Sequence, residues 1–415
     1  MKLLFIHQNF PGQYRHLATR FAAEAGNRVF GLGDRGNLAG RPRLPGVEML
    51  AYPAQPGASA GTHAYVRSHE SAVRRGQAVA RALLELRRRG VVPDVICAHP
   101  GWGEALFVKD VMPESRLLGY FEFYYRGAGS DVGFDPEFPA SLDERCRVRV
   151  KNSTMLVSLD AADAGIAPTR WQEAQFPAAW QAKIAVIHDG IDTDGIRPDP
   201  DDRLTLPDGE ILTTADEVVT FVARNLEPYR GFHVFMRALP RILERRPQAR
   251  VVIVGGDEVS YGRPPDSGGT YREQLLAECG DAIDPGRVHF LGRVPYPRYL
   301  SVLHVSSVHV YLTYPFVLSW SLLEAMAAGC LVVASRTPPV TEVVEDGVNG
   351  WLTDFFAVEA LAERVCEALA SRRSLASLAA AARQTIVEGY DLQRLCLPRQ
   401  TELVRGLAGG KIGGS

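Results

Sequence analysis

Two arginines and one glutamate carry the clearest chemistry in this sequence. Arg224 and Arg230 lie in the segment VARNLEPYRG, directly after an apolar run, and Glu324 lies further along in SWSLLEAMAAGC. Each segment follows a strand-like run and leads into a helix. Arginines form directional, charge-assisted hydrogen bonds with phosphates, and a helix N-terminus adds unpaired backbone N–H groups. Because a carboxylate accepts hydrogen bonds from ribose hydroxyls, this combination favours a nucleoside diphosphate as the ligand.

The same residues also have structural interpretations. Arg224 and Arg230 lie near Glu227 and could be ordinary surface charges. Ser321 and Glu324 have the spacing of a capping box, in which the two side chains bond the first N–H groups of their helix. The capping role and the ligand role of Glu324 are compatible, so both stay open.

Polar residues also follow predicted strands in the first half of the chain. His99 and Trp102 come directly after one such strand, where an imidazole can hydrogen-bond a sugar hydroxyl. Asn9, Gly12 and Gln13 follow the first strand, and glycine permits close approach of a ligand to the backbone. This loop lacks the G-x-G-x-x-G pattern of dinucleotide-binding turns. A tight turn and a structural histidine are the alternatives to a binding role.

An acidic and aromatic stretch, EFYYR, follows another predicted strand of the first half. Glu122, Tyr124 and Tyr125 combine a carboxylate with aromatic faces, which suits a polyol, although an ordinary loop has a similar composition. Residues 67–89 are rich in arginine and predict a basic helix. Such a helix can contact an anionic membrane surface or can simply be a solvated face.

The elements that would position these residues alternate between short apolar runs and amphipathic stretches. That alternation predicts an α/β protein with largely parallel sheets. Two of the predicted helices are 14–25 and 64–89, and a late one is 392–407. The predicted strands are 3–6, 29–32, 47–51, 94–98, 117–121, 165–168 and 184–187, followed by 218–223, 250–254, 288–291, 308–312 and 331–334.

The segment 188–208, rich in Asp, Gly and Pro, separates these two sets of elements. We therefore predict a Rossmann-like domain of residues 1–192, completed by a helix within 390–408, and a second such domain of residues 193–389. Ligands of open α/β sheets bind at the carboxyl ends of the strands, so we expect the site in a crevice between the domains. The glycine-rich end, 406–415, is expected to fray.

The composition of the chain argues against several classes of protein and indicates the cellular compartment. A formal net charge of −2 argues against a general nucleic-acid-binding protein. The six cysteines contain no C-x-x-C pair, which favours free thiols in a reducing cytoplasm. The sequence shows no signal-peptide pattern and no apolar run of about 20 residues, so we expect no spanning helix.

The motifs, in this order, resemble glycosyltransferase family 4. This family comprises retaining nucleotide-sugar transferases of GT-B architecture, in which two Rossmann-like domains face each other across a cleft. The resemblance spans nearly the whole chain, and its most specific part is SLLEAMAAGCLVVAS, residues 321–335, which looks like the family's signature helix and strand. ARNLEPYRG looks like the phosphate segment, with Arg230 in place of the family's lysine. VHFLGRV, residues 288–294, looks like the strand and turn that frame the nucleobase.

The resemblance also implies roles for single residues. Arg224 and Arg230 would hold the diphosphate, Glu324 the ribose, and His99 would lie near the donor sugar. The expected catalytic residues are Arg224, Arg230 and His99. The expected donor-binding residues are Gly12, Arg224, Arg230, Arg293, Val294, Phe316, Ser319, Trp320, Ser321 and Glu324. The expected acceptor-side residues are Asn9, Gln13, Trp102, Glu122, Tyr124 and Tyr125.

One position departs from the family pattern. The family has a second glutamate eight positions before the signature glutamate, and this chain has Phe316 there. Three positions later, Ser319 replaces the usual glycine. The missing carboxylate is the one placed against the donor sugar, so Asp257, Glu258 and Glu122 are the candidates to replace it.

The resemblance implies a cytoplasmic hexosyltransferase-type enzyme of class EC 2.4. It would move a sugar, with retention, from a UDP-, GDP- or dTDP-linked donor to a hydroxyl of a small molecule, glycan or lipid. A lipid acceptor would imply peripheral contact with the inner membrane face. No cofactor and no metal is expected, because Arg224, Arg230 and the helix N-terminus would neutralise the leaving diphosphate. An inactive nucleotide- or glycan-binding protein and, less favoured, a nucleotide-sugar epimerase remain as alternatives, and the oligomeric state is not predicted.

Overall fold

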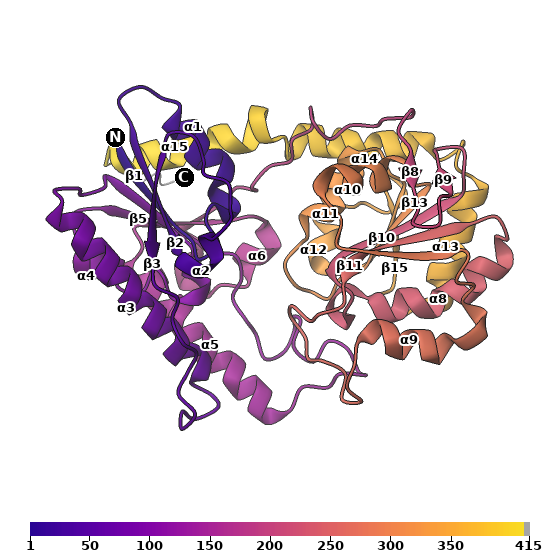
Figure 1. Cartoon of the computed structure of the whole chain (residues 1–415), viewed down its shortest axis with the longest axis horizontal. Helices are drawn as coiled ribbons and strands as arrows, with labels where there is room; N and C mark the ends of the chain where they lie inside the picture. Colours follow the sequence, from indigo (N-terminus) through magenta and orange to yellow (C-terminus); the bar gives the residue numbers. More distant parts are fainter. Residues whose placement is uncertain (411–415) are drawn as a thin grey trace. The chain divides into compact units, whose positions relative to one another are not determined.

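The computed structural model describes residues 1–410 of the chain, which form two compact units. The first unit contains Met1–Gly190 and the described residues from Gln393 onward, and the second contains Ile191–Leu392. Each unit is a Rossmann-like α/β fold with its own parallel sheet, as the sequence predicted (Figure 1). Residues 411–415 of the end predicted to fray lie outside the described part, whereas 406–408 are helical.

The first unit is built on a seven-stranded parallel sheet in the order β3-β2-β1-β4-β5-β6-β7. Most of its strands are largely buried, which is why they read as apolar runs in the sequence, whereas the edge strand β3 is partly exposed. The strands are β1 (Lys2–Ile6), β2 (Arg28–Asp34), β3 (Val47–Tyr52), β4 (Val95–Ala98), β5 (Arg116–Tyr120), β6 (Ala164–Ala167) and β7 (Ile184–Val186). The helices are η1 (Gly12–Tyr14), α1 (Arg15–Ala22), α2 (Arg35–Leu38), α3 (Arg67–Arg88), η2 (Pro100–Trp102), α4 (Val108–Val111), α5 (Leu142–Ala161), α6 (Arg170–Ala174), α7 (Ala178–Gln181) and α15 (Leu397–Ala408).

The basic helix α3 makes ion pairs with acidic residues of its own unit. Arg74 pairs with Glu70 at 2.5 Å, and Arg87 pairs with Glu114 at 2.5 Å. These pairs favour the solvated-face interpretation of the arginine-rich stretch over membrane contact. Among the helices that the structure describes, none has the length and apolarity needed to cross a membrane.

The second unit is built on a six-stranded parallel sheet in the order β12-β11-β10-β13-β14-β15, preceded by a small antiparallel hairpin, β8-β9. Helices α8, α9 and α13 lie along one face of the sheet, and α10, α11 and α14 lie along the other (Figure 1). The strands are β8 (Leu204–Thr205), β9 (Ile211–Leu212), β10 (Val218–Asn225), β11 (Arg250–Gly256), β12 (Val288–Gly292), β13 (Val308–Tyr311), β14 (Val332–Ser335) and β15 (Trp351–Thr353). The helices are η3 (Pro228–Arg230), α8 (Phe232–Arg245), α9 (Tyr271–Cys279), η4 (Gly280–Ala282), α10 (Tyr296–His304), α11 (Trp320–Ala327), α12 (Pro338–Thr341), α13 (Val358–Ala370) and α14 (Ala376–Gly389), with η5 (Leu392–Cys396) at the return to the first unit.

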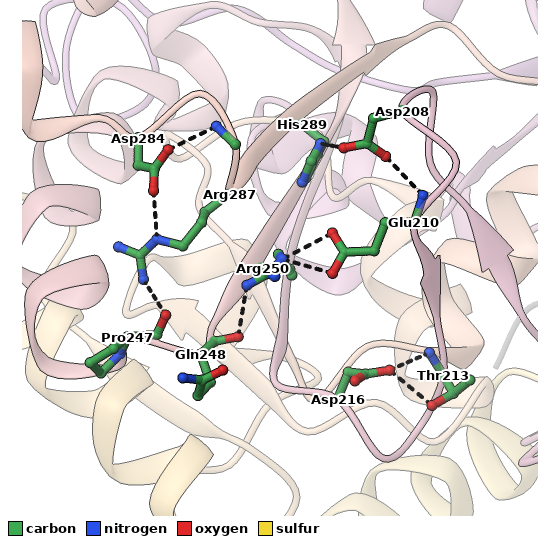
Figure 2. Close-up of polar contacts among 11 residues, drawn as sticks. Asp208, Glu210, Thr213, Asp216, Pro247, Gln248, Arg250, Asp284, Arg287 and His289 are labelled. Atoms are coloured by element: carbon green, nitrogen blue, oxygen red, sulfur yellow. Dashed lines mark hydrogen bonds and ion pairs between the residues drawn. The ribbon is translucent and has the colours of Figure 1, made fainter.

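Charged side chains fasten the amino-terminal edge of this second sheet (Figure 2). Arg250, at the start of β11, donates from Nε to both carboxylate oxygens of Glu210 at 3.0 Å. Arg287, just before β12, bonds Asp284 and the carbonyl of Pro247. The Arg250 contact holds the turn of the β8-β9 hairpin against the start of β11, and the Arg287 contacts hold the loop before β12 against the chain that precedes β11.

The late helix predicted at 392–407 belongs to the first unit. It begins as η5 and continues as α15, which packs against α1. The Nε2 of Gln400 donates to the carbonyl of His188, and Arg405 pairs with Glu24 at 2.8 Å. The first sheet is therefore covered partly by a helix that follows all of the second unit.

Candidate functional site

The order of the second sheet places Arg224 at a topological switch point. The chain leaves β10 on one side toward β11 and returns on the other side to β13, and ligands of doubly wound sheets bind where the order reverses. Arg224 lies next to the carboxyl end of β10, and its side chain is exposed. It makes no hydrogen bond or ion pair with any residue that the structure describes. Its guanidinium is therefore available to an anionic ligand.

Arg230, in contrast, is a buried guanidinium with partners of its own. It is 7% exposed, and its Nη1 donates to Thr313 Oγ1 at 2.8 Å and to the carbonyl of Val317 at 3.0 Å. The next residue, Gly231, has φ of +67°, and a Cβ there would come within 2.3 Å of the Leu312 side chain. Glycine is required at this turn, so the chain can enter α8 with Arg230 folded inward.

The predicted capping box at the start of α11 is wrong. The N-cap is Ser319, whose side chain accepts from the backbone N–H of Ser321 at 3.3 Å. The helix therefore begins two residues earlier than a cap at Ser321 requires, and Glu324 is too far along to reach the unpaired N–H groups. Trp320, the first residue of the helix, is largely exposed.

Glu324 faces two tyrosines. Its carboxylate accepts hydrogen bonds from the hydroxyl of Tyr296 at 2.9 Å and from that of Tyr299 at 2.7 Å. Burial raises the pKa of Glu324, and the two tyrosine hydrogen bonds oppose that rise. The carboxylate is therefore oriented by α10, from which both tyrosines come.

Tyr311 joins Arg230 to the start of α11. Its hydroxyl accepts from Arg230 Nη1 at 3.3 Å and from the backbone N–H of Ser319 at 2.9 Å. The buried guanidinium and the positive end of this helix are thus brought together by one phenol oxygen. The sequence analysis did not single out Tyr311, because a tyrosine within a buried strand has no distinguishing signal.

Phe316 is 4% exposed and belongs to an aromatic group around Arg230. Its ring is edge-on to Tyr229 and Tyr261, with centroids 5.6 Å and 4.9 Å away. The Arg230 guanidinium lies 5.3 Å from the Tyr261 ring and 5.9 Å from the Phe316 ring. The position where the family has a carboxylate is therefore part of an apolar wall.

A polar network connects the ends of β10, β11 and β12. Arg293 donates to Asn225 Oδ1 at 2.9 Å and to Glu258 at 2.7 Å, and Asn225 donates to Ser260 at 2.7 Å. Val294, next to Arg293, is partly buried. Glu258 is therefore engaged by an arginine. Asp257, another candidate for the missing acid, pairs with Arg272 at 2.8 Å.

Sequence reasoning gave Glu227 no functional role, yet it organises the loop beside this network. Its fully buried carboxylate accepts the backbone N–H groups of Ser260, Tyr261 and Gly262 at 2.9–3.1 Å. Tyr261 is thereby held against Arg230. No sequence signal connects Glu227 with a loop more than thirty residues away, so only the structure identifies it.

His99 lies after β4 at the carboxyl edge of the first sheet. Its Nδ1 accepts from the backbone N–H of Gly101, and its ring stacks on Trp102 and Tyr120. The Nε2 atom lies 3.5 Å from a carboxylate oxygen of Glu122. The structure therefore brings together three residues that the sequence analysis had singled out: His99, Trp102 and Glu122.

The first loop packs against a second histidine, His7. The Nδ1 of His7 accepts from the backbone N–H of Asn9 at 2.9 Å, and a Cβ at Gly12 would come within 2.7 Å of its ring. Burial, with a smaller contribution from His99, lowers the pKa of His7 to about 3, and a contact with Gln13 opposes the shift. Gly12 is therefore needed for the packing of a neutral imidazole, which the sequence did not reveal.

Tyr124 and Tyr125 do not join the His99 cluster through their rings. Tyr124 packs against Phe176, and the ring of Tyr125 lies 3.5 Å from the ammonium of Lys151. Glu104, which interacts electrostatically with His99, is fully buried, and Tyr52 donates to one of its carboxylate oxygens at 3.3 Å. Burial raises the pKa of Glu104, which favours a neutral acid.

Two groups of potential metal ligands lie in the second unit, and neither is at the carboxyl edge of its sheet. Asp208, Glu210 and His289 offer atoms within 4.8 Å of one another, but Arg250 already occupies both oxygens of Glu210 (Figure 2). The other group is Asp199, Asp202 and His304, in which Asp202 bonds His304 at 2.6 Å. In both groups, carboxylate oxygens are thus already engaged by other side chains of the unit.

Family models match both halves of the chain. Residues 25–196 match the model of the glycosyl transferase family 4 group, and residues 208–385 match that of the glycosyl transferases group 1. The chain belongs to glycosyltransferase family 4. The resemblance inferred from its motifs is thereby confirmed. The first matched range ends within the segment 188–208, and the second begins at its last residue.

Curated members of this family share about a quarter to a third of the aligned residues. A GDP-mannose-dependent α-(1-6)-phosphatidylinositol monomannoside mannosyltransferase of Mycolicibacterium smegmatis is 28% identical over 55% of this chain and 59% of its own length. A D-inositol 3-phosphate glycosyltransferase of Streptomyces griseus is 30% identical over 52% of this chain and 47% of its own length. The matches thus span between about half and three fifths of these two relatives.

Solved structures with the same fold align with nearly the full length of this chain. Anabaena HepE in complex with UDP-glucose has a TM-score of 0.68 at 18% identity, with 99% of this chain and 100% of that chain covered. Sucrose-phosphate synthase from Thermosynechococcus elongatus has a TM-score of 0.72 at 17% identity, with the same coverage. At these identities the likeness establishes the fold, which is the GT-B architecture predicted from the sequence.

Proposed function

We propose that this chain is a retaining glycosyltransferase that moves a sugar from a nucleoside-diphosphate sugar to an acceptor hydroxyl. The observation that carries the proposal is Arg224: an exposed guanidinium without partners among the described residues, at the switch point of the second sheet. Family membership and the names of the curated relatives, which include GDP-mannose-dependent transferases, support it. In this proposal the second unit binds the donor and the first unit binds the acceptor.

Arg224 and the positive end of α11 stabilise the negative charge that develops on the leaving diphosphate. Arg230 contributes indirectly. It donates to the hydroxyl of Tyr311, which also accepts from the backbone N–H of Ser319 at the start of α11. Such preorganised donors stabilise a transition state without reorganising during the reaction. With these cations present the diphosphate needs no metal ion, so we expect activity to persist in the presence of EDTA.

Glu324 binds the ribose hydroxyls, and Tyr296 and Tyr299 hold its carboxylate in place. Arg293 and Val294 border the nucleobase, while Ser319, Trp320 and Ser321 supply the helix start beside the phosphates. Phe316 presents an apolar surface toward the donor sugar. A donor that is less polar at that position, such as a deoxysugar, fits this wall better than one that requires a carboxylate there.

The first unit supplies the acceptor side. His99, held by Gly101 and stacked on Trp102, directs Nε2 toward Glu122 and is the proposed contact to the donor sugar or the acceptor hydroxyl. Asn9, Gly12 and Gln13 form the loop beside it. The curated relatives carry names with inositol phosphate or phosphatidylinositol mannoside acceptors, which supports a phosphorylated small molecule or lipid glycan as the acceptor class. A lipid acceptor would bring the protein to a membrane surface.

The deciding experiment measures binding of UDP and GDP, and of uridine and guanosine, to wild type and Arg224→Ala by calorimetry. We expect the variant to lose about 30-fold in affinity for the nucleoside diphosphate that binds, because a charged hydrogen-bond partner is worth roughly 2 kcal/mol. Affinity for the nucleoside should be unchanged. Arg203→Ala is the matched control, since Arg203 is also exposed and its side chain bonds no described residue. Equal losses for diphosphate and nucleoside would contradict the proposed phosphate role.

A donor screen then separates catalysis from binding. Incubation with UDP-, GDP- and dTDP-sugars, with release of nucleoside diphosphate as the readout, should show turnover that Arg224→Ala lowers. Tight binding without turnover would instead support a nucleotide-binding protein, and an altered sugar nucleotide would support an epimerase.

A further inference from the structure

A cavity lies at the amino-terminal edge of the second sheet, at the opposite ends of the strands from Arg224. Its volume is about 1190 Å³. It is lined by residues just before β10, β13 and β14, by the end of α13 and by the start of α14. The proposed transferase site uses none of these residues.

The charges around this cavity are strongly unbalanced. Four arginines line it, Arg246, Arg372, Arg373 and Arg383, against the single carboxylate of Glu217. Glu217 is already paired with Arg246. For the other three arginines, no carboxylate of a described residue lies within ion-pair distance. The cavity therefore carries an excess of positive charge that its own lining does not neutralise.

The three remaining arginines differ in their contacts. Arg372 donates to the carbonyl of Asp216 at 2.6 Å and to Ser307 Oγ at 2.9 Å. Arg383 donates to backbone carbonyls, including those of Ala327 at 2.5 Å and Thr193 at 3.0 Å. Both are held in place by neutral acceptors, so their positive charges persist.

Burial lowers the pKa of Arg383, and Asp194 opposes this shift only in part. A nearby anion would therefore stabilise this guanidinium. Arg373 is exposed and makes no hydrogen bond or ion pair within the described part of the chain. It is the arginine most available to a ligand.

The start of α14 adds to the positive field. The helix runs from Ala376 to Gly389, and its N-cap, Leu375, provides no side-chain acceptor for the first N–H groups. Unpaired N–H groups at a helix start favour anions, and phosphate most of all. Ala376 lines the cavity together with Ala379 and Ala380, so small apolar side chains leave room beside the arginines.

A hydrogen-bonded turn before β10 forms part of the cavity lining. Thr214 and Ala215 line the cavity, and the flanking Thr213 donates from both its backbone N–H and its hydroxyl to Asp216 at 2.8 Å and 2.9 Å (Figure 2). The carbonyls of Ala215 and Asp216 receive Arg372, which closes this turn onto the α13–α14 connection. Hydrogen bonds thus fasten this turn to the α13–α14 connection at the edge of the cavity.

We propose that this cavity binds a phosphate group, carried either by a soluble small molecule or by a lipid headgroup. Arg373 and the N-terminus of α14 contact the phosphate, Arg372 and Arg383 supply the surrounding positive field, and the alanines receive the apolar part of the ligand. Phosphate is favoured over a carboxylate because planar guanidinium groups and helix N–H groups both match its several oxygens.

The test uses hydrogen exchange measured by mass spectrometry, because it reports where an anion binds and not only that it binds. Titration of the full chain with inorganic phosphate should protect peptides covering residues 370–384. Arg373→Ala should raise the half-saturating phosphate concentration for that protection by about tenfold, the loss expected for one charged contact. Arg203→Ala is the control and should behave as wild type, and Arg224→Ala should leave protection of 370–384 unchanged.

A second arm distinguishes the two sources of phosphate. Vesicles of phosphatidylcholine with added phosphatidic acid are compared with phosphatidylcholine alone in the same exchange measurement. Protection of 370–384 by the phosphatidic acid vesicles identifies a lipid headgroup, and protection by soluble phosphate only identifies a small molecule. Absence of protection with both probes, or equal half-saturating concentrations in wild type and Arg373→Ala, would overturn the proposal.

Discussion

Arg224 and Arg230 illustrate how two identical side chains six residues apart acquire different tasks. The buried Arg230 side chain donates to two hydroxyls and a carbonyl and is flanked by aromatic rings. The side chain of Arg224, in contrast, has no partner among the described residues. Removing Arg230 would leave buried acceptors unpaired, so its loss is expected to affect folding as well as binding. Arg224 can be replaced without such damage, which makes it the informative position.

We predict that a substitution of Glu324 weakens ligand binding without destabilising α11. Glu324→Gln removes the charge but keeps an oxygen that accepts from one tyrosine, and affinity for the nucleoside diphosphate should fall about tenfold. Calorimetry gives the affinity, and thermal unfolding should change little because the residue does not cap α11. Tyr296→Phe serves as the control: it removes a largely exposed hydroxyl from the same carboxylate without removing the charge. A large drop in melting temperature with unchanged affinity would assign Glu324 a purely structural role.

The residues whose positions could be predicted from the sequence are those that follow strands. Arg224, His99 and Glu122 come after apolar runs, and parallel strands bring such positions to one edge of their sheet. Glu227 and Tyr311 could not be found in this way. Their partners lie far along the chain, and the sequence contains no pattern that pairs a buried carboxylate with three distant N–H groups.

At the scale of elements, the capping-box interpretation of Ser321 would begin α11 two residues too late. The pattern Ser321-x-x-Glu324 satisfied the rule for a capping box, but Ser319 offers an earlier cap, and the hydroxyl of Tyr311 receives its backbone N–H. The competing contact from a neighbouring strand decided between two possible caps. Local spacing alone cannot include such a contact.

If Ser319 is the N-cap of α11, replacing it should destabilise the protein more than replacing Ser321. Ser319→Ala should lower the free energy of unfolding by about 1 kcal/mol, the usual cost of losing an N-cap side chain, and Ser321→Ala should cost clearly less. Urea unfolding of both variants, followed by circular dichroism, makes the comparison. If Ser321→Ala is the more destabilising change, the capping box operates in solution after all.

The strands were predictable because most are buried on both faces and read as continuous apolar runs. The exceptions are short or peripheral. Strand β15 has three residues at the sheet edge, and the β8-β9 hairpin pairs strands of two residues each around a turn with Gly209. Runs this short do not stand out from the surrounding loop composition, so neither was expected.

Within β13, a buried histidine makes stability depend on pH. His309 is fully buried, its Nδ1 lies 2.9 Å from Thr220 Oγ1, and burial lowers its pKa from 6.5 to about 4. Below pH 6.5 the unfolded chain takes up a proton that the folded chain does not, so stability falls as the pH is lowered from 6.5 toward 4. At pH 5 the cost from this one group is about 2 kcal/mol.

The measurement is the midpoint of urea unfolding at pH 7 and pH 5. Wild type should lose more stability between the two pH values than His309→Asn, because the variant has no proton to gain at that position. If the stability of both proteins depends equally on pH, His309 does not contribute to the pH dependence of unfolding.

At the scale of the whole molecule, the two units differ in how the chain builds them. The second is continuous, from Ile191 to Leu392, whereas the first is made from two separate stretches, the second of which contains α15. Leu397, Val404 and Leu407 of this helix are buried, and Gln400 bonds the carbonyl of His188. Each unit carries its own hydrophobic core.

Removing the chain from residue 397 onward should therefore affect only one unit. We predict faster hydrogen exchange in α1, β4 and β5, which lose the contacts of α15, and unchanged exchange in β10, β11 and β13. Mass spectrometry of peptides from both units measures this, with the intact chain as reference. Equal loss of protection in the two units would show that they unfold as one.

The return of α15 to the first unit also has a consequence for synthesis on the ribosome. The strands made first wait, without their last helix, until the whole of the second unit has been translated. The second unit is complete as soon as Leu392 has emerged from the ribosome, so it can fold first although it is synthesised later. The order of translation and the order of completion are thus reversed, and the exposed face of the early sheet is the surface that a chaperone would need to shield in that interval.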